Sequence, residues 1–213
     1  MPKRTGLTER GITERALEMV DRDGIDGLSM RKLAGLLDVS PMTLYTYFAD
    51  REALLEAVTQ LIYAKIDAPE NSGGSRDTVR RLMHSVRNVL LAHPNALPLI
   101  PLHPPRTLEA LVFVNAGHRA LREAGVGPLD TARAYRALAA YSIGTASVEV
   151  SRYFAAREAD SSAYPSVAAA DLERLLPHVA EVAPLLGLLD DTAEFDYGLD
   201  LTLDGVMQRH GAE

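Results

Sequence analysis

The sequence predicts an all-α fold. Strand patterns, in which Val, Ile and Thr alternate between turn residues, are hard to find. Apolar residues instead recur at helical spacing along most of the 213 residues, and 47% of the residues are apolar, enough for a substantial core. One such stripe comprises Leu54, Leu55, Val58, Leu61, Ile62 and Ile66.

Four helices are predicted before residue 67, and each begins after a residue whose side chain can accept a hydrogen bond from the first helical turn. These N-cap residues are Thr8, Ser29, Ser40 and Asp50. Pro41 takes the first position of the third helix, where its missing N–H removes no helical hydrogen bond. Gly24 ends the first helix.

A polar segment, "DAPENSGGS" at residues 67–75, is predicted to be a hinge between two domains, 1–66 and 76–213. Beyond it a fifth helix follows Val79 to Leu90. The stretch 93–106 carries five of the twelve prolines and should form short bent pieces. Further helical patterns are predicted over 105–124, 129–158, 167–186 and 192–209.

Composition limits the class of protein. The chain has no cysteine, so disulfides and thiolate chemistry are excluded. The first residues lack the apolar stretch of a signal peptide, and no run approaches the roughly 20 apolar residues of a membrane span, so we expect a soluble cytoplasmic protein. The net charge is −7, but residues 1–66 hold 9 basic and 10 acidic side chains, so most of the acidity lies later.

The third predicted helix has two different faces. At about 100° per residue, Leu44, Tyr45 and Phe48 form an apolar wedge that should point inward. The opposite face is formed by positions 42, 43, 46 and 47 and holds Met, Thr, Thr and Tyr, with no charge. A solvated face would more often carry Lys or Glu.

The turn "LLDVSP" joins this helix to the one before it, as in a helix-turn-helix. Hydroxyls and methyls on the second helix of such a motif can reach phosphates and base edges in the major groove of DNA. Arg31 and Arg51 flank the helix with positive charge. The alternative is a small helical hairpin whose exposed Met42 and Tyr47 pack on a partner domain.

Residues 16–58 resemble the N-terminal DNA-binding domain of the TetR (tetracycline repressor) family of bacterial regulators. Asp38 departs from the family pattern, which usually has Gly at this left-handed position; Asp tolerates that conformation less well than Gly but better than most residues. The matching positions are Ala16, Gly24, Ser29, Arg31, Leu33, Ala34, Val39, Ser40, Leu44, Tyr45, Tyr47, Phe48, Arg51, Leu54 and Leu55.

The resemblance implies two sets of DNA contacts. Residues against base edges or sugars would be Arg31, Pro41, Met42, Thr43 and Tyr47. Residues nearer the phosphates would be Ser40, Tyr45, Thr46 and Arg51, with added contacts from a basic arm of Lys3, Arg4 and Arg10. The ring of Tyr45 would belong to the inward wedge while its hydroxyl reaches the DNA.

A motif this small needs two half-sites one DNA turn apart, which requires a homodimer on a palindromic operator. Two C-terminal stretches can supply the contact: "LERLLPHVAEVAPLLGLL", and the stripe Phe195, Leu199, Leu203 and Val206. Family members are similar in pairing C-terminal helices across a two-fold axis. The alternative is that these stripes only close the core of the single chain.

The resemblance also implies a small-molecule effector pocket in the C-terminal helices, where "IGTASVE" is similar to tetracycline-repressor-like domains. The candidate lining residues are His103, Asn115, His118, Tyr141, Thr145 and Glu149. His103 resembles in placement a magnesium-ligating histidine of tetracycline repressors, but one histidine is not a metal site. We therefore expect no metal and no cofactor, and the tetracycline constellation is not present as a set.

The function that follows is a ligand-responsive transcriptional regulator, a repressor released from its operator when a small molecule, acting through the fourth helix, alters the spacing of the two DNA-binding heads. A DNA-binding regulator controlled by a protein partner, or bound constitutively, stays open as an alternative. An enzyme is not expected: no Glu precedes a His by three residues, and HExxH, GxSxG and Walker motifs are absent, so no catalytic residue is assigned.

Overall fold

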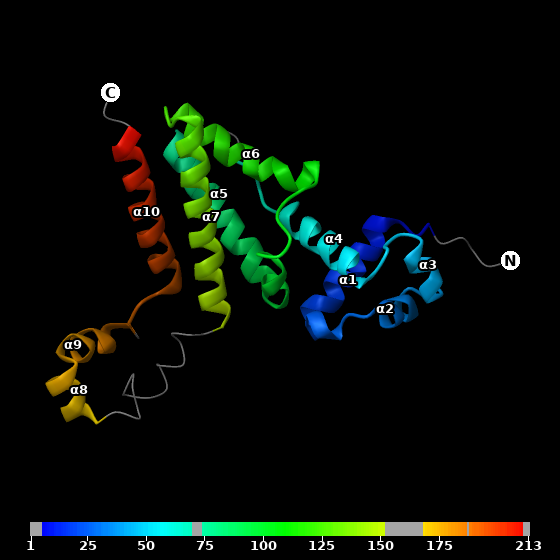
Figure 1. Ribbon diagram of the computed structural model, residues 1–213, viewed down its shortest axis with the longest axis horizontal. Helices are drawn as coiled ribbons and strands as arrows, with labels where there is room; N and C mark the ends of the chain where they lie inside the picture. The colour runs from blue at the N-terminus through cyan, green and yellow to red at the C-terminus, as the bar shows by residue number, and fades with distance from the viewer. Residues whose placement is uncertain (1–5, 70–73, 152–167, 187, 211–213) are drawn as a thin grey trace. The chain divides into compact units, whose positions relative to one another are not determined.

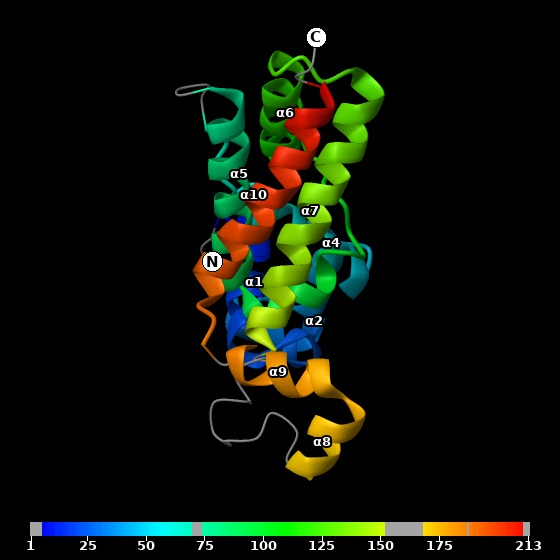
Figure 2. The ribbon, with the colours of Figure 1, turned by 90° about the vertical axis from the view of Figure 1, so that its left-hand side faces the viewer.

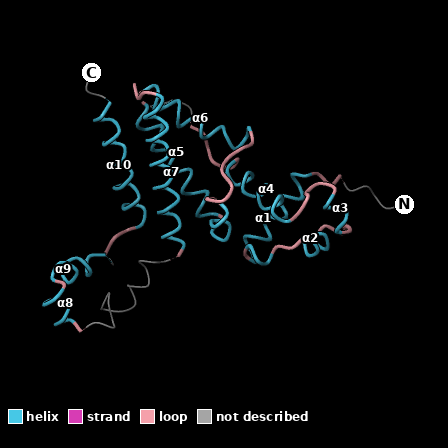
Figure 3. Tube along the Cα trace, viewed as in Figure 1, coloured by secondary structure: helices cyan, strands magenta, loops and turns pink. Residues whose placement is uncertain are grey.

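The computed structural model describes residues 6–69, 74–151, 168–186 and 188–210, and these contain helices and no strand, as the sequence predicts (Figures 1 and 3). The chain divides into two compact units, Met1–Tyr135 and Arg136–Glu213. Within the described residues, none of the helices combines the length and the apolar character that crossing a bilayer requires.

The first unit begins with the four predicted helices, which with the 3₁₀ turn η1 form a part that we call the head, residues 6–66. Each predicted cap is confirmed: Thr8, Ser29, Ser40 and Asp50 accept hydrogen bonds from backbone N–H groups three residues later. The elements are α1 (Glu9–Asp23), η1 (Ile25–Gly27), α2 (Met30–Leu36), α3 (Pro41–Tyr45) and α4 (Arg51–Tyr63).

The core of the head is built from one apolar face of each helix, and α1 packs against α4. Its fully buried side chains include Ile12, Leu33, Leu44, Leu54 and Val58. Burying a side chain of this size stabilises a fold by about 1.5–3 kcal/mol. The short helices α2 and α3 are therefore held by packing, since helices of this length are not stable alone.

Two further helices and a proline-rich connection complete the first unit: α5 (Ser75–Ala92), η2 (Pro94–Leu99) and α6 (Leu108–Glu123). The stretch 93–106 is bent as predicted, because Pro98 lies inside η2 and the next helix begins only after Pro104 and Pro105. Thr107 caps α6 by accepting from the N–H of Ala110 at 3.1 Å.

The second unit contains most of α7 (Pro128–Val150) together with α8 (Ala169–Leu175), α9 (Pro177–Leu186) and α10 (Asp191–His210). Figures 1 and 2 show α7 and α10 side by side. The single helical pattern predicted over 167–186 is two helices, because Pro177 starts a new one after Leu176. Residues 152–158 of the helix predicted over 129–158 lie outside the described residues.

The prediction that the stripe on α10 forms a dimer surface is wrong for most of its members. Phe195, Leu199 and Leu203 are at most 1% exposed within the single chain, and Val206 is half-buried. These side chains close the chain's own core, which was the alternative. The other predicted stretch does leave large apolar side chains exposed: Leu175, Leu176, Val182, Leu185, Leu188 and Leu189.

Candidate nucleic-acid interface and pocket

The turn between α2 and α3 has the geometry of a helix-turn-helix. Asp38 adopts φ 52°, the left-handed conformation expected at this position. The N–H of Val39 then donates to the carbonyl of Ala34 at 3.0 Å, which closes the end of α2. Ser40 and Pro41 start α3 directly afterwards. Asp is thus tolerated where the family pattern has Gly.

The inward face of α3 differs from prediction at one position. Leu44 and Phe48 are 0% and 4% exposed, as expected for the apolar wedge. Tyr45, predicted to place its ring in the same wedge, is 46% exposed. Leu44 and Phe48 are four residues apart, so both lie on the same inward face. Tyr45 lies about 100° around the helix from Leu44 and therefore points away from that face. Its ring and its hydroxyl both lie at the surface.

The outward face of α3 is exposed and uncharged. Met42 is 71% exposed and Tyr47 39% exposed, while Thr46 is exposed and Thr43 half-buried. On either side of these residues Arg31, Ser40 and Pro41 are also exposed. Eight of the nine candidate DNA contacts therefore lie on or beside α3, and seven of those eight are exposed.

The ninth candidate, Arg51, is already engaged within the chain. Its Nε donates to the carbonyl of Leu28 at 2.9 Å, and a terminal nitrogen donates to the carbonyl of Ile25. These bonds tie the start of α4 to the segment between α1 and α2. Spacing alone did not reveal this role, because the partners lie 23 and 26 residues away.

The N-terminal segment that holds the basic arm contacts the candidate interface through a hydrogen bond between Tyr47 and Leu7. The hydroxyl of Tyr47 donates to the carbonyl of Leu7 at 3.0 Å. Farther along the arm, Arg10 pairs with Glu14 on the exposed side of α1 at 3.0 Å. Lys3 and Arg4 lie outside the described residues.

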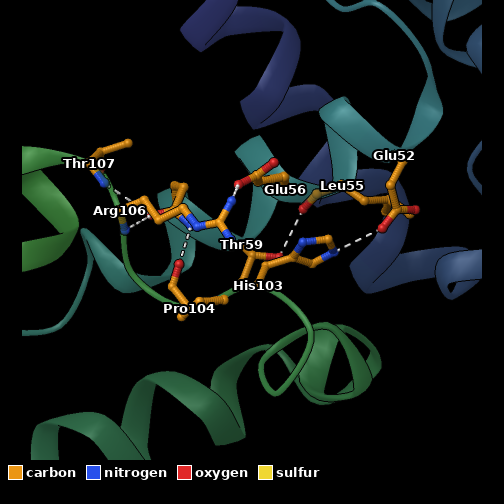
Figure 4. A network of polar contacts seen from close by, with 9 residues as sticks. Glu52, Leu55, Glu56, Thr59, His103, Pro104, Arg106 and Thr107 are labelled. Carbon is orange, nitrogen blue, oxygen red and sulfur yellow. Dashed lines mark hydrogen bonds and ion pairs between the residues drawn. The ribbon is translucent and has the colours of Figure 1, made fainter.

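A buried glutamine of α4 binds the segment before α6, whose residues Pro104, Arg106 and Thr107 are labelled in Figure 4. The side-chain amide of Gln60, 7% exposed, donates to the carbonyl of Pro104 at 2.9 Å. Its oxygen accepts from the N–H of Arg106 at 2.7 Å and from the N–H of Thr107 at 3.3 Å. One side chain of the head thus satisfies three backbone groups of the chain that leads into α6.

An ion pair, a histidine–carboxylate contact and a hydroxyl group extend this junction along α4. Arg106 pairs with Glu56 at 2.9 Å. Nε2 of His103 lies 3.2 Å from Oε1 of Glu52, although the angle is not that of a hydrogen bond. The hydroxyl of Tyr63 donates to the carbonyl of Ile100 at 3.0 Å, and burial raises the pKa of Tyr63 to about 12.

The same segment also contacts α1. Nδ1 of His93 lies 2.9 and 3.0 Å from the two carboxylate oxygens of Asp21. The side-chain amide of Asn95 donates to the carbonyl of Asp21 at 2.8 Å. Residues 93–107, which we call the junction segment, are therefore fixed to both α1 and α4 of the head.

A pocket of about 550 Å³ lies in the second unit, between α7 and the chain from Leu186 to Leu201. Three of the six candidate effector contacts line it: Tyr141, Thr145 and Glu149, one turn apart on α7. The hydroxyl of Tyr141 donates to the carbonyls of Glu194 and Phe195, and its ring stacks on Phe195 with 5.6 Å between centroids.

Gly198 is what allows Tyr141 to take this position. A Cβ at residue 198 would lie 2.2 Å from the Tyr141 hydroxyl oxygen and 2.6 Å from the adjoining ring carbon. Any larger residue at position 198 would displace the ring from the pocket wall.

The other three candidates do not line this pocket. His103 is buried in the junction segment beside Glu52, so it is placed to hold α4. His118 packs edge-on against Tyr135 with 4.7 Å between ring centroids, and Asn115 is exposed on α6. Burial raises the pKa of Tyr135 as well.

Comparison with known proteins accounts for most of the chain. The family model described as "Bacterial regulatory proteins, tetR family" matches residues 12–58. The model described as "Tetracyclin repressor-like, C-terminal domain" matches residues 68–210. The first match covers the helix-turn-helix, and the second covers the junction segment and the pocket.

Individual relatives agree with these matches. An HTH-type transcriptional regulator of Saccharopolyspora erythraea is 35% identical over 180 residues, which is 76% of this chain and 74% of the relative. The class A tetracycline repressor of Escherichia coli is 25% identical over 96% of this chain and 93% of its own length. The structure of ActR from Streptomyces coelicolor in complex with actinorhodin has the same fold, with a TM-score of 0.83 and 24% identity over 96% of this chain and 99% of that one. The chain belongs to the TetR family of bacterial DNA-binding transcriptional regulators.

Proposed function

We propose that this regulator is a repressor that binds a two-fold-symmetric operator as a homodimer and leaves it when a small molecule binds the C-terminal helices. In this proposal residues 1–66 bind DNA, and residues 76–213 bind the effector and dimerise. The observation that carries it is the exposed, uncharged face of α3 in a chain whose C-terminal helices hold a pocket and match the tetracycline-repressor-like model.

The operator is contacted by the face of α3 and its neighbours. We assign base or sugar contacts to Arg31, Pro41, Met42, Thr43 and Tyr47, and phosphate contacts to Ser40, Tyr45 and Thr46. Exposure of seven of these side chains supports the assignment. Arg51 contributes mainly by holding the segment between α1 and α2, and only its remaining N–H groups can reach a phosphate.

The effector site in this proposal is the pocket beside Tyr141, Thr145 and Glu149. Its volume falls in the usual range for small-molecule sites, and its lining combines apolar side chains with a few polar ones. The class A tetracycline repressor and ActR, solved with actinorhodin, support a small-molecule effector by family membership.

The junction segment is the proposed route from effector to operator. It continues directly into α6 and is bonded to α4 by Gln60 and to α1 by Asp21. A shift of this segment therefore moves the head with it. The effector can lower the affinity for the operator only by the difference between its own affinities for the two positions of the junction segment.

Dimerisation is assigned to exposed apolar side chains of the second unit. Tyr197 is 64% exposed and Leu201 58% exposed, next to each other on one face of α10. Both also line the pocket's rim, so a second copy packed there would close the pocket from outside. We expect Leu201→Asp to give a monomer by light scattering and to abolish binding to a two-half-site operator. A dimer in that variant would rule out this face.

Operator selection from random DNA tests the DNA-binding half. We expect a symmetric enriched site whose binding is lost in Tyr47→Ala. Release of that site by members of a small-molecule library, with matching shifts in melting temperature, tests the effector half. A protein that binds the site but is released by no small molecule would favour the partner-controlled or constitutive regulator.

No catalytic role is assigned to the chain, in keeping with a family of transcriptional regulators. We also propose that it acts in the cytoplasm, where a bacterial repressor meets its DNA.

A further inference from the structure

The recognition face of α3 centres on an apolar side chain. Met42 occupies the second position of α3 and is 71% exposed. In a helix-turn-helix, residues at the start of the second helix contact base edges in the major groove. We propose that Met42 determines specificity by reading the 5-methyl group of a thymine in each operator half-site. The inference rests on the operator binding proposed above.

The hydroxyl groups around Met42 are already engaged. Ser40 Oγ accepts from the N–H of Thr43 at 3.2 Å and lies 3.0 Å from Thr43 Oγ1, so one of the two hydroxyl hydrogens lies between these oxygens. Thr46 Oγ1 donates to the carbonyl of Thr43 at 2.7 Å. One hydroxyl hydrogen of the Ser40–Thr43 pair and that of Thr46 are thus engaged within the chain, whereas Met42 can contact a base without needing a hydrogen bond.

No charged side chain occurs from Pro41 to Tyr47. Guanine is read most often by Arg or Lys, adenine by Asn or Gln, and cytosine by Asp or Glu. None of these residue types is present on α3. Thymine is the one base that offers an apolar group in the major groove, its 5-methyl, and an apolar side chain is the group that recognises it.

Methionine is well suited to this contact. Its unbranched thioether chain adapts to the surface it meets, and it carries no hydrogen-bonding group that contact with a methyl would leave unsatisfied. A cytosine at the same position would present hydrogen where thymine has the methyl. The surface of Met42 would then lose its apolar partner.

An isolated exposed methionine would need no explanation, because single apolar side chains are common on surfaces. Met42 is not isolated. In the described part of the head, the large apolar side chains that are exposed are Leu36, Met42, Tyr45 and Tyr47, all between the end of α2 and the residues just after α3. Exposed apolar groups gathered at one place mark a binding surface.

The test replaces single thymines in the selected operator with deoxyuridine, which removes only the 5-methyl. Affinities of the full-length protein are measured by fluorescence anisotropy at fixed salt. At one thymine of each half-site we expect deoxyuridine to weaken binding about fourfold, the effect of one buried methyl. In Met42→Ala the same substitution should have no effect at that position, so the two losses are not additive.

Leu129→Ala is the matched control, because Leu129 is 63% exposed on α7 and lies outside both the head and the junction segment. Its deoxyuridine profile should equal that of the wild type. The inference is overturned if deoxyuridine is harmless at every thymine, or if its effect persists unchanged in Met42→Ala. Failure to enrich any operator sequence would instead overturn the proposed function itself, and this inference with it.

Discussion

The head and the C-terminal helices expose apolar surface in different ways. In the head nearly all large apolar side chains are buried, and the exceptions gather around α3. From α8 to the start of α10 such side chains are exposed at Leu175, Leu176, Val182, Leu185, Leu188 and Leu189, and α10 adds Tyr197 and Leu201 on one face. The head is thus complete as a single chain and shows one small contact surface, whereas the C-terminal helices show a broad apolar face suited to another protein chain or to an effector.

The largest effect that tests this contrast is expected when a core side chain of the head is removed. Phe48→Ala should lower the free energy of unfolding by about 3–5 kcal/mol, because a buried aromatic leaves a cavity beside Leu44. Urea denaturation measures the loss. Leu108→Ala, at an 83% exposed position of α6 outside the head, should change the free energy of unfolding by less than about 0.5 kcal/mol. Equal losses would contradict the contrast.

The contrast between the tightly packed head and the C-terminal helices can be tested further at the junction segment, where hydrogen bonds join the head to the chain leading into α6. Gln60→Leu should destabilise the protein by about 2 kcal/mol, because three backbone groups lose their partner. Hydrogen exchange at the amides of Arg106 and Thr107 should accelerate. Gln208→Leu, at an exposed position of α10, is the matched control. Unchanged exchange in Gln60→Leu would show that Gln60 does not hold the segment.

High pH should act on the same junction through Tyr63. Burial raises its pKa to about 12 from about 10, so the folded protein holds this proton more tightly than the unfolded chain does. Stability is therefore unaffected by this group below about pH 10 and falls as the pH rises towards 12. The difference between wild type and Tyr63→Phe should shrink by about 1.4 kcal/mol between pH 9 and pH 11. A constant difference over that range would mean that the hydroxyl is not buried.

The smallest expected effect concerns the cap of the recognition helix. Ser40→Ala should cost about 1 kcal/mol, because the N–H of Thr43 loses its partner. Ser40→Asp, which can cap equally well, should restore stability measured by thermal unfolding. Operator affinity should fall in both variants if Ser40 also contacts a phosphate, most in Ser40→Asp because of its charge. If the wild type, Ser40→Ala and Ser40→Asp had the same stability, Ser40 would not stabilise the start of α3 by capping.

The sequence was sufficient for features that depend on neighbours along the chain. All four caps of the head and the bent proline-rich stretch could be predicted because their physical causes lie within a few residues, whereas the left-handed position of Asp38 was implied by the family resemblance. Tyr141, Thr145 and Glu149 were chosen because the stretch that holds them resembles tetracycline-repressor-like domains, and these three residues line one pocket.

Features that depend on distant partners could not be predicted. The contact of Gln60 with the junction segment spans 44 to 47 residues, and Arg51 is held by carbonyls more than 20 residues away. The stripe through Phe195 has the same pattern whether it faces the chain's own core or a second copy, so periodicity could not decide between them. The ring of Tyr45 was wrongly predicted to lie in the core. The helix α3 has only five residues, and a helix this short turns only one narrow line of side chains towards the core.

The bond from Tyr47 to the carbonyl of Leu7 has a practical consequence for the biochemist. It holds Leu7 against the face of α3 that we propose contacts the operator, so an affinity tag fused at the N-terminus would be attached close to that face. A polyhistidine or basic tag there would add its own phosphate contacts, and the measured salt dependence would then partly describe the tag. Operator affinities of this protein are best compared after the tag has been removed.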